Sequence, residues 1–429
     1  MTRQNRFVTL LAAALAAVAC DGAPQAGASA SATGTADSTS GSADAGADSG
    51  GVAVASCIDG IVNGTETAKD CGGSCSPCAV GSACKIPADC ATALCASGSC
   101  VSPGYLIGTA ATATLTPVLT TNLKQPTALG FHPTEPDQLW VASFEDGALT
   151  VAHGVTSGTA TKVQRYRDEQ MHFLEKVISL SFSDNKTFGT CGDTRNDYNG
   201  MAPANDFMGP VQWPAMLKDF QTYGPDASKV HLDMMHDTPR CMGIAAASGN
   251  SYFVFNGLSG NIDLYDFGLP HPHGADDHSD GSKRRYLGLG LKRVAGVPGH
   301  LAYDAKTETL YIADTGNSRV LRMDTKAGSF VKDVKLYPVE VKMEVWKTTS
   351  FAEVASGFDQ PSGLLLHEGT LYMGDAGTGR LYAFSPAGDF FGSVETGLPK
   401  GALAGLAAGP DAKLYVADRK GNRVLRVER

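Results

Sequence analysis

The chain has 429 residues and a formal net charge of −9 at pH 7, with a sequence pI near 5.6. An acidic chain of this kind lacks the basic surface that follows a phosphate backbone, so nucleic acid is excluded as an expected partner. The apolar run that comes nearest to a membrane span, Phe7–Ala19, is shorter than the roughly 20 residues that a spanning helix needs.

The first twenty residues, 1–20, have the pattern of an export signal. Arg3 and Arg6 precede an apolar core at Phe7–Ala17, and the segment ends in the letters AVAC. Small residues followed directly by Cys resemble a bacterial lipobox. This resemblance implies that Cys20 is lipidated and anchors the protein without spanning the membrane. An ordinary signal cleaved at an Ala-x-Ala-like site is the alternative. We therefore expect an exported protein of the bacterial cell envelope, on its periplasmic face or at the cell surface.

Composition divides the remaining chain into three parts. Residues 21–56 are almost wholly Gly, Ala, Ser, Thr and Asp, which predicts a disordered tether. Residues 57–101 form a small cysteine-rich module, part of which resembles cysteine-rich repeats of δ-proteobacterial surface proteins. A segment of this size cannot build a sufficient core unaided, so four disulfides of unassigned pairing are expected. Zinc at Cys75 and Cys78, which have ligand spacing, is the alternative. The eight cysteines are Cys57, Cys71, Cys75, Cys78, Cys84, Cys90, Cys95 and Cys100.

Residues 105–429 contain a repeated hairpin pattern. Leu310–Asp324 reads LYIADTGNSRVLRMD, Leu414–Glu428 reads LYVADRKGNRVLRVE, and Leu371–Ser385 is a looser copy. An apolar run, a turn of Gly and Asn type and a second alternating run predict a β-hairpin. Recurrence every 40 to 60 residues or so, six times in all, predicts an all-β, six-bladed β-propeller. Since Val118–Pro126 resembles the outer strand before blade five, we expect an N-terminal strand to complete the last blade and close the ring.

At these residues the hairpins resemble the NHL family, strongly over 298–429 and only by inference over 105–297. The matching positions are Asp314, Gly316, Asn317, Arg319 and Val320, and again Asp418, Gly421, Asn422, Arg423 and Val424. The family includes the peptidyl-amidoglycolate lyase domain, a six-bladed propeller with zinc held by histidines in its channel. The resemblance implies a comparable site here without transferring the reaction.

Blades two and three depart from the repeat where polar loops are inserted. His172, His236 and His300 each lie just before, or at, the first strand of blades two, three and four. The loops that enter first strands share one face of a propeller, so these imidazoles are expected at the channel mouth, with His231 as a further ligand. Three histidines with an open fourth position are typical of catalytic zinc. Solvated loop histidines are the alternative.

Other candidates lie in the same two inserts. Asp276, Asp277 and His278 belong to a loop that counting places on the opposite face, where carboxylates suit calcium as well as zinc. Candidate substrate-binding residues are Arg195, Tyr198 and Arg240, with Arg240 suited to a carboxylate. We expect Cys191 and Cys241 to form a disulfide that fixes the long insert, with a redox role as the alternative.

Two functions compete. The first is a lipid-anchored propeller that presents a binding face to a protein, a peptide or a small molecule. The second is a divalent-metal lyase or hydrolase acting in the channel, with zinc the leading metal. Catalytic residues are not assigned. The sequence lacks a G-x-S-x-G elbow, a P-loop and a G-x-G-x-x-G followed by a βαβ pattern, so no serine triad or nucleotide cofactor is expected. We expect a monomer.

Overall fold

The computed structural model describes residues 56–196, 206–275, 278–335 and 341–428. The predictions for the signal, most of the tether, the lipidation of Cys20, and for Tyr198, Asp276 and Asp277 lie outside these residues. No helix of the described chain is long and apolar enough to cross a membrane.

The cysteine-rich module holds little regular structure, namely a 3-10 turn at Pro87–Asp89 and a two-stranded ribbon of β1 (Cys95–Ala96) and β2 (Ser99–Cys100). All eight cysteines form disulfides, which confirms the expected four bonds. The pairs are Cys57–Cys75, Cys71–Cys78, Cys84–Cys95 and Cys90–Cys100. Because a thiolate is the form of cysteine that binds zinc, these cystines do not provide the alternative zinc site.

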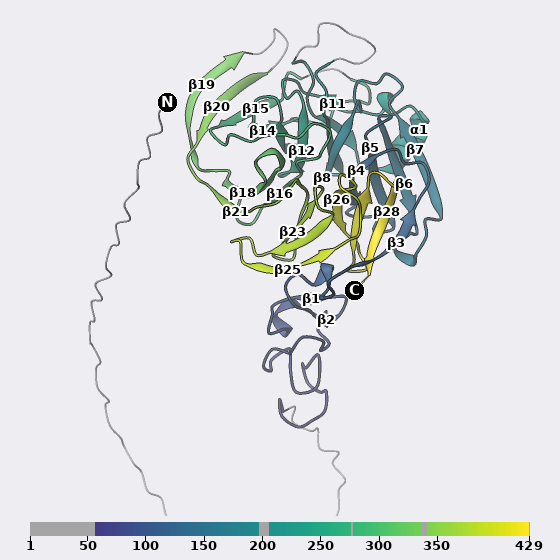
Figure 1. Cartoon of the computed structure of the whole chain (residues 1–429), viewed down its shortest axis with the longest axis vertical. Coiled ribbons are helices and arrows are strands. Elements are labelled where there is room, and N and C mark those ends of the chain that lie inside the picture. Colours follow the sequence, from purple (N-terminus) through teal and green to yellow (C-terminus); the bar gives the residue numbers. More distant parts are fainter. Residues whose placement is uncertain (1–55, 197–205, 276–277, 336–340, 429) are drawn as a thin grey trace, which may run out of the picture. The chain divides into compact units, whose positions relative to one another are not determined.

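The next part of the chain folds into antiparallel sheets that surround a common axis (Figure 1). Blade one consists of β4 (Pro126–Phe131), β5 (Gln138–Ser143), β6 (Ala148–His153) and β7 (Lys162–Arg167). Blade two consists of β8 (Val177–Phe182), β9 (Thr187–Gly192), β10 (Val211–Pro214) and β11 (Asp233–Met234). Blade three consists of β12 (Cys241–Ala246), β13 (Ser251–Asn256), β14 (Asn261–Asp266) and β15 (Ser282–Leu287).

The last three blades contain the clearest copies of the repeat. Blade four consists of β16 (Leu301–Asp304), β17 (Thr309–Asp314), β18 (Arg319–Asp324) and β21 (Phe351–Ser356). Blade five consists of β22 (Pro361–His367), β23 (Thr370–Asp375), β24 (Arg380–Phe384) and β25 (Phe390–Glu395). Blade six consists of β26 (Leu403–Ala408), β27 (Leu414–Asp418), β28 (Arg423–Glu428) and the N-terminal strand β3 (Thr114–Leu119).

The ring closes as the sequence predicts. Strand β3 pairs antiparallel with β28, from Thr114 opposite Glu428 to Leu119 opposite Val424. The innermost strands β4, β8, β12, β16, β22 and β26 contact one another in that order, and β26 returns to β4. The six-bladed propeller and its closure by an N-terminal strand are therefore confirmed.

One hairpin was not predicted. Strands β19 (Gly328–Lys335) and β20 (Lys342–Thr348) are inserted between β18 and β21 of blade four. Strand β20 pairs in parallel with β15, so the hairpin extends the sheet of blade three to six strands (Figure 1). The other helical segments among the described residues are short: α1 (Leu217–Tyr223) and 3-10 turns at Tyr105–Ile107, Val155–Ser157, Ala227–Lys229 and Thr315–Asn317.

The polar positions of the repeat hold the turn after each second strand. In blade four the buried carboxylate of Asp314 accepts hydrogen bonds from Lys292 N, Asn317 Nδ2 and Arg319 Nε, each at 2.8 Å. In blade six Asp418 accepts from Gly421 N at 2.8 Å and from Arg423 Nε at 2.7 Å. Because these carboxylates are buried and saturated with local donors, the recurring motif is a folding element and not the functional site.

Candidate functional site

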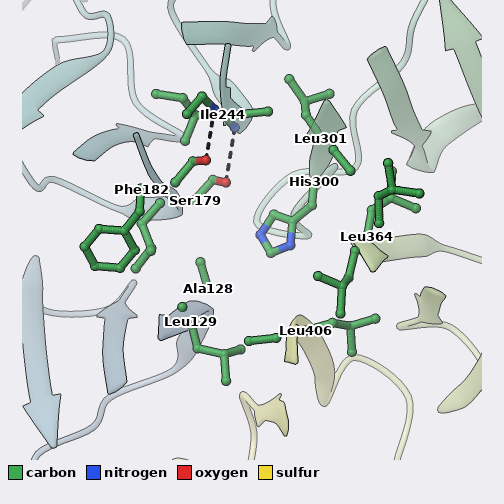
Figure 2. A pocket seen from close by; sticks show the side chains of 18 of the residues that line it. Ala128, Leu129, Ser179, Phe182, Ile244, His300, Leu301, Leu364 and Leu406 are labelled. Atoms are coloured by element: carbon green, nitrogen blue, oxygen red, sulfur yellow. Dashed lines mark hydrogen bonds between the residues drawn. The ribbon is translucent and has the colours of Figure 1, made fainter. Parts of the chain in front are cut away.

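The propeller axis contains a cavity of about 420 Å³, lined by residues of all six innermost strands. Most of the side chains that line it are small or apolar, and Figure 2 shows Ala128, Ile244, Leu301, Leu364 and Leu406 around it, but polar atoms make up the larger part of the surface that faces the cavity. The innermost strands are unpaired on the axial side, so backbone amide and carbonyl groups also face the cavity. The volume lies in the range of small-molecule sites.

The cavity has an open and a closed end. The final residues of the innermost strands, among them Phe131, Phe182 and Ala408, are partly exposed, whereas residues near the strand starts, such as Ala128 and Ile244, are buried. The open end is therefore the face that carries the turns between first and second strands.

The segment 288–299 covers the closed end. Asp193 of blade two accepts hydrogen bonds from Gly296 N at 2.8 Å and from Arg293 Nη1 at 3.1 Å, and Arg419 of blade six donates to Gly296 O. Blades two and six are not neighbours in the ring, so this segment crosses the axis. Arg240 Nη1 donates to Asp193 O at 3.0 Å, so this predicted substrate-binding residue helps to hold the cover.

His300 lies at the closed end, and Figure 2 shows its ring directed into the cavity. Its Nε2 lies 3.3 Å from Ile178 O, which as an acceptor places the ring proton on Nε2. Burial lowers the pKa of His300 to about 4, so the imidazole is neutral near pH 7. Nδ1 then carries a lone pair and has no hydrogen-bond partner among the described residues, which makes it an acceptor for a group in the cavity.

Two serines provide hydroxyl groups on the neighbouring wall. Ser179 Oγ accepts from Ile244 N at 3.1 Å, and Ser181 Oγ accepts from Ala246 N at 2.9 Å (Figure 2). Each hydroxyl keeps its own proton for a further hydrogen bond. The cavity thus combines mostly apolar side chains with exposed polar groups, among them one imidazole acceptor and two hydroxyl groups.

The structure does not bring His172, His236 and His300 together. The rings of His172 and His236 lie 6.2 and 3.7 Å from that of Phe207, whereas His300 faces the innermost strand of blade two. Of these three histidines only His300 lines the cavity. The expectation that the loops before three first strands direct their imidazoles to one point needs correction, because the blade-two insert places Phe207 against two of them.

His231 also packs on an aromatic ring. Its imidazole stacks on Phe173 at 3.9 Å, and its Nδ1 lies 2.6 Å from Ser228 O. In the described chain, two groups of three possible metal ligands have their atoms within 4.8 Å of one another, and neither includes a histidine. They are Cys84, Cys90 and Cys100, and Cys57, Glu66 and Cys75. The cysteines in both groups are disulfide-bonded.

The insert of blade three, residues 268–281, meets the histidines of blade two, although counting strands predicts that it lies on the opposite face. His278 is buried, and its Nδ1 lies 2.6 Å from Asp233 Oδ1. Its ring lies 4.9 Å from that of His236. A count of strands does not reveal this contact, because the insert extends away from its own blade edge. None of these three residues lines the axial cavity.

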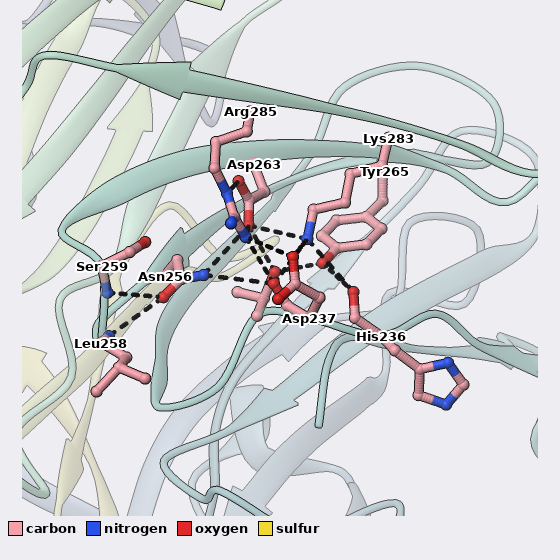
Figure 3. Close-up of polar contacts among 10 residues, drawn as sticks. His236, Asp237, Asn256, Leu258, Ser259, Asp263, Tyr265, Lys283 and Arg285 are labelled. Carbon is pink, nitrogen blue, oxygen red and sulfur yellow. Dashed lines mark hydrogen bonds and ion pairs between the residues drawn. The ribbon is translucent and has the colours of Figure 1, made fainter. Parts of the chain in front are cut away.

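A buried ion network supports the backbone at His236 (Figure 3). Lys283 and Arg285 from β15 contact Asp263 at 3.3 and 2.7 Å and Asp237 at 3.1 Å each. Burial alone would raise the pKa of Asp263, but the two cations hold it well below its usual range. Tyr265 OH donates to His236 O at 2.6 Å. The network fixes the segment between blades two and three.

Two further predictions concern the long insert of blade two. Cys191 and Cys241 form a disulfide, as predicted, and link β9 to β12. Arg195 pairs with Asp206, with Nε and Nη2 at 2.9 and 2.7 Å from Oδ1. Arg195 therefore ties the insert to itself in this structure.

No protein-family model matches the sequence, and no curated protein matches it. Solved structures resemble it weakly. An auxiliary nutrient binding protein from Bacteroides thetaiotaomicron is 10% identical over 78% of each chain, with a TM-score of 0.47. A streptogramin B lyase is 11% identical over 75% of this chain and 99% of its own, with a TM-score of 0.41. A luciferin-regenerating enzyme is 11% identical over 74% and 95%, with a TM-score of 0.43. Such likeness assigns no function, and membership of the NHL family stays a prediction.

Proposed function

We propose that this protein is an exported, lipid-anchored binding protein whose axial cavity takes a compact molecule that has apolar surface and a hydrogen-bond donor. The observation that supports this most directly is the cavity itself, which is closed at one end and lined by mostly apolar side chains with polar groups exposed between them. The neutral His300 imidazole offers the acceptor at the closed end. The five disulfides of the described chain are typical of an oxidising compartment outside the cytoplasm.

The metal-dependent lyase or hydrolase alternative receives less support. It requires several ligands around one open position, and in the described chain only one of the three predicted histidines lines the cavity. Binding needs no such convergence, because the shape of the cavity, its apolar side chains and one directed acceptor are sufficient for it.

The test uses 4-ethylphenol and ethylbenzene as probes, which differ by one hydroxyl donor. Saturation-transfer NMR with the purified full-length protein should show binding of 4-ethylphenol at millimolar concentration and weaker binding of ethylbenzene. Ala408→Trp at the open end should abolish both signals, whereas Ala387→Trp on an exposed turn should leave them unchanged. Absence of 4-ethylphenol binding to the wild type, or equal binding to Ala408→Trp, would refute the proposal.

A further inference from the structure

Two buried ligand atoms face each other outside the axial cavity without a hydrogen bond between them. Asp233 is 1% exposed, and its Oδ2 has no hydrogen-bond partner among the described residues. His271 Nδ1, also buried and without a hydrogen-bond partner, lies 3.9 Å from that oxygen. Leaving both atoms unsatisfied in a buried place costs free energy, so a third species between them is expected.

A second carboxylate sets the orientation of the His271 ring. Asp280 Oδ1 lies 3.2 Å from His271 Nε2, which favours a proton on Nε2 and a lone pair on Nδ1. Nδ1 lies 3.9 Å from Asp233 Oδ2, which is also electron-rich. Histidines that bind metals commonly have a carboxylate beside their other ring nitrogen.

The Asp233 carboxylate is held from the other side. Its Oδ1 accepts a hydrogen bond from Met234 N and lies close to His278 Nδ1, both at 2.6 Å. Asp233 also belongs to β11, in register with Gln212 of β10. The β11 pairing, the Met234 amide and the His278 imidazole together fix the Asp233 carboxylate. The position of Oδ2 is therefore set before any ion binds.

We propose that Asp233 Oδ2 and His271 Nδ1 bind a divalent transition-metal ion of the zinc class, with Asp280 as a positioning residue. One carboxylate oxygen and one imidazole nitrogen favour such an ion over calcium or magnesium, which prefer oxygen ligands only. Zinc bonds of about 2.0 to 2.1 Å put tetrahedral ligands about 3.3 Å apart, so the two atoms would approach by roughly half an ångström. Water or a ligand would fill the other coordination positions.

The test is a titration of the EDTA-stripped, full-length protein with Zn²⁺ by calorimetry and with Co²⁺ by visible absorption. We expect one site in the wild type. Its affinity should fall more than tenfold in His271→Gln and in Asp233→Asn, which keeps the side-chain shape, and about ten- to a hundredfold in Asp280→Asn. His271 is 13% exposed, so His271→Gln should still fold, and a thermal melt verifies this.

A matched control is available on blade one. His153 Nδ1 and Asp137 Oδ2 form a more exposed pair at 3.4 Å, and His153→Gln and Asp137→Asn should leave Zn²⁺ binding unchanged. The proposal is overturned if the wild type binds no Zn²⁺ at 1 mM, as expected if only water separates the two atoms. It is also overturned if folded His271→Gln binds as tightly as the wild type. Neither result bears on binding in the axial cavity, which these residues do not line.

Discussion

The buried imidazole of His300 should make the stability of the propeller depend on pH between about 4 and 6.5. Its pKa is lowered to about 4 by burial, whereas an unfolded chain has a histidine pKa near 6.5. Between these values the unfolded state binds one proton more than the folded state, so the free energy of unfolding rises with pH and is level above about 6.5. At about 1.4 kcal/mol per pH unit, the interval amounts to about 3 kcal/mol.

The measurement compares wild type with His300→Gln by guanidinium denaturation at several pH values from 4 to 8. Subtracting the two curves cancels the groups that titrate in both proteins and leaves the part due to His300. We expect the difference to change by about 3 kcal/mol between pH 4 and 6.5 and to be constant above. His153→Gln, which removes a more exposed histidine, should run parallel to the wild type. Parallel curves for His300→Gln as well would show that burial of His300 does not set its pKa.

Two further predictions concern the framework. Asp314→Ala should remove about 3 to 5 kcal/mol of local stability. The reason is that Lys292 N, Asn317 Nδ2 and Arg319 Nε would lose the buried carboxylate that accepts their hydrogen bonds. Hydrogen exchange at Lys292 should speed up, while Asp304→Ala, which removes a half-buried carboxylate of another turn, should leave it unchanged; unaltered exchange in Asp314→Ala would contradict this role. Replacing Cys191 and Cys241 with Ser opens a link across 50 residues and should lower the free energy of unfolding by about 4 kcal/mol, measured by calorimetry. No loss would mean that other contacts already fix the insert.

The sequence predicts the fold well because the repeat records it several times. The turn residues of blades four and six recur at the same spacing, and each copy indicates the same hairpin, so local and long-range signals agree. The closing strand is predictable for the same reason, since Val118–Pro126 follows the pattern of an outer strand. The hairpin β19–β20 has no counterpart in another blade, so no repeat indicates where it packs.

The candidate site is predictable only in part. His300 occupies an innermost-strand position defined by the repeat, and the structure places it in the axial cavity. His172 and His236 lie in or beside inserted loops, whose direction depends on packing with Phe207. The pairing of Asp233 with His278 joins residues 45 positions apart through such an insert. Spacing along the chain contains no signal for that contact.

The blades that lose the repeat pattern are the ones that carry the candidate sites, and the contacts of their buried carboxylates differ from those in the regular blades. In blades four and six the buried aspartate after the second strand binds its own turn. In blade three Asn256 takes this position and binds Leu258 N and Ser259 N, while the buried charge stands on Asp263 and holds Lys283 and Arg285.

In blade two Gly192 takes this position, and the next residue, Asp193, carries the buried carboxylate, which reaches Gly296, 103 residues away. A buried carboxylate therefore closes a local turn in the regular blades and makes longer-range contacts in the irregular ones. Asp193 holds the segment that covers the axial cavity beside His300, and the ion network around Asp263 fixes the backbone at His236. A buried carboxylate requires hydrogen-bond donors wherever it lies. When it no longer bonds to its own turn, it takes donors from more distant segments and fixes them, and in this way a regular blade can become part of a site.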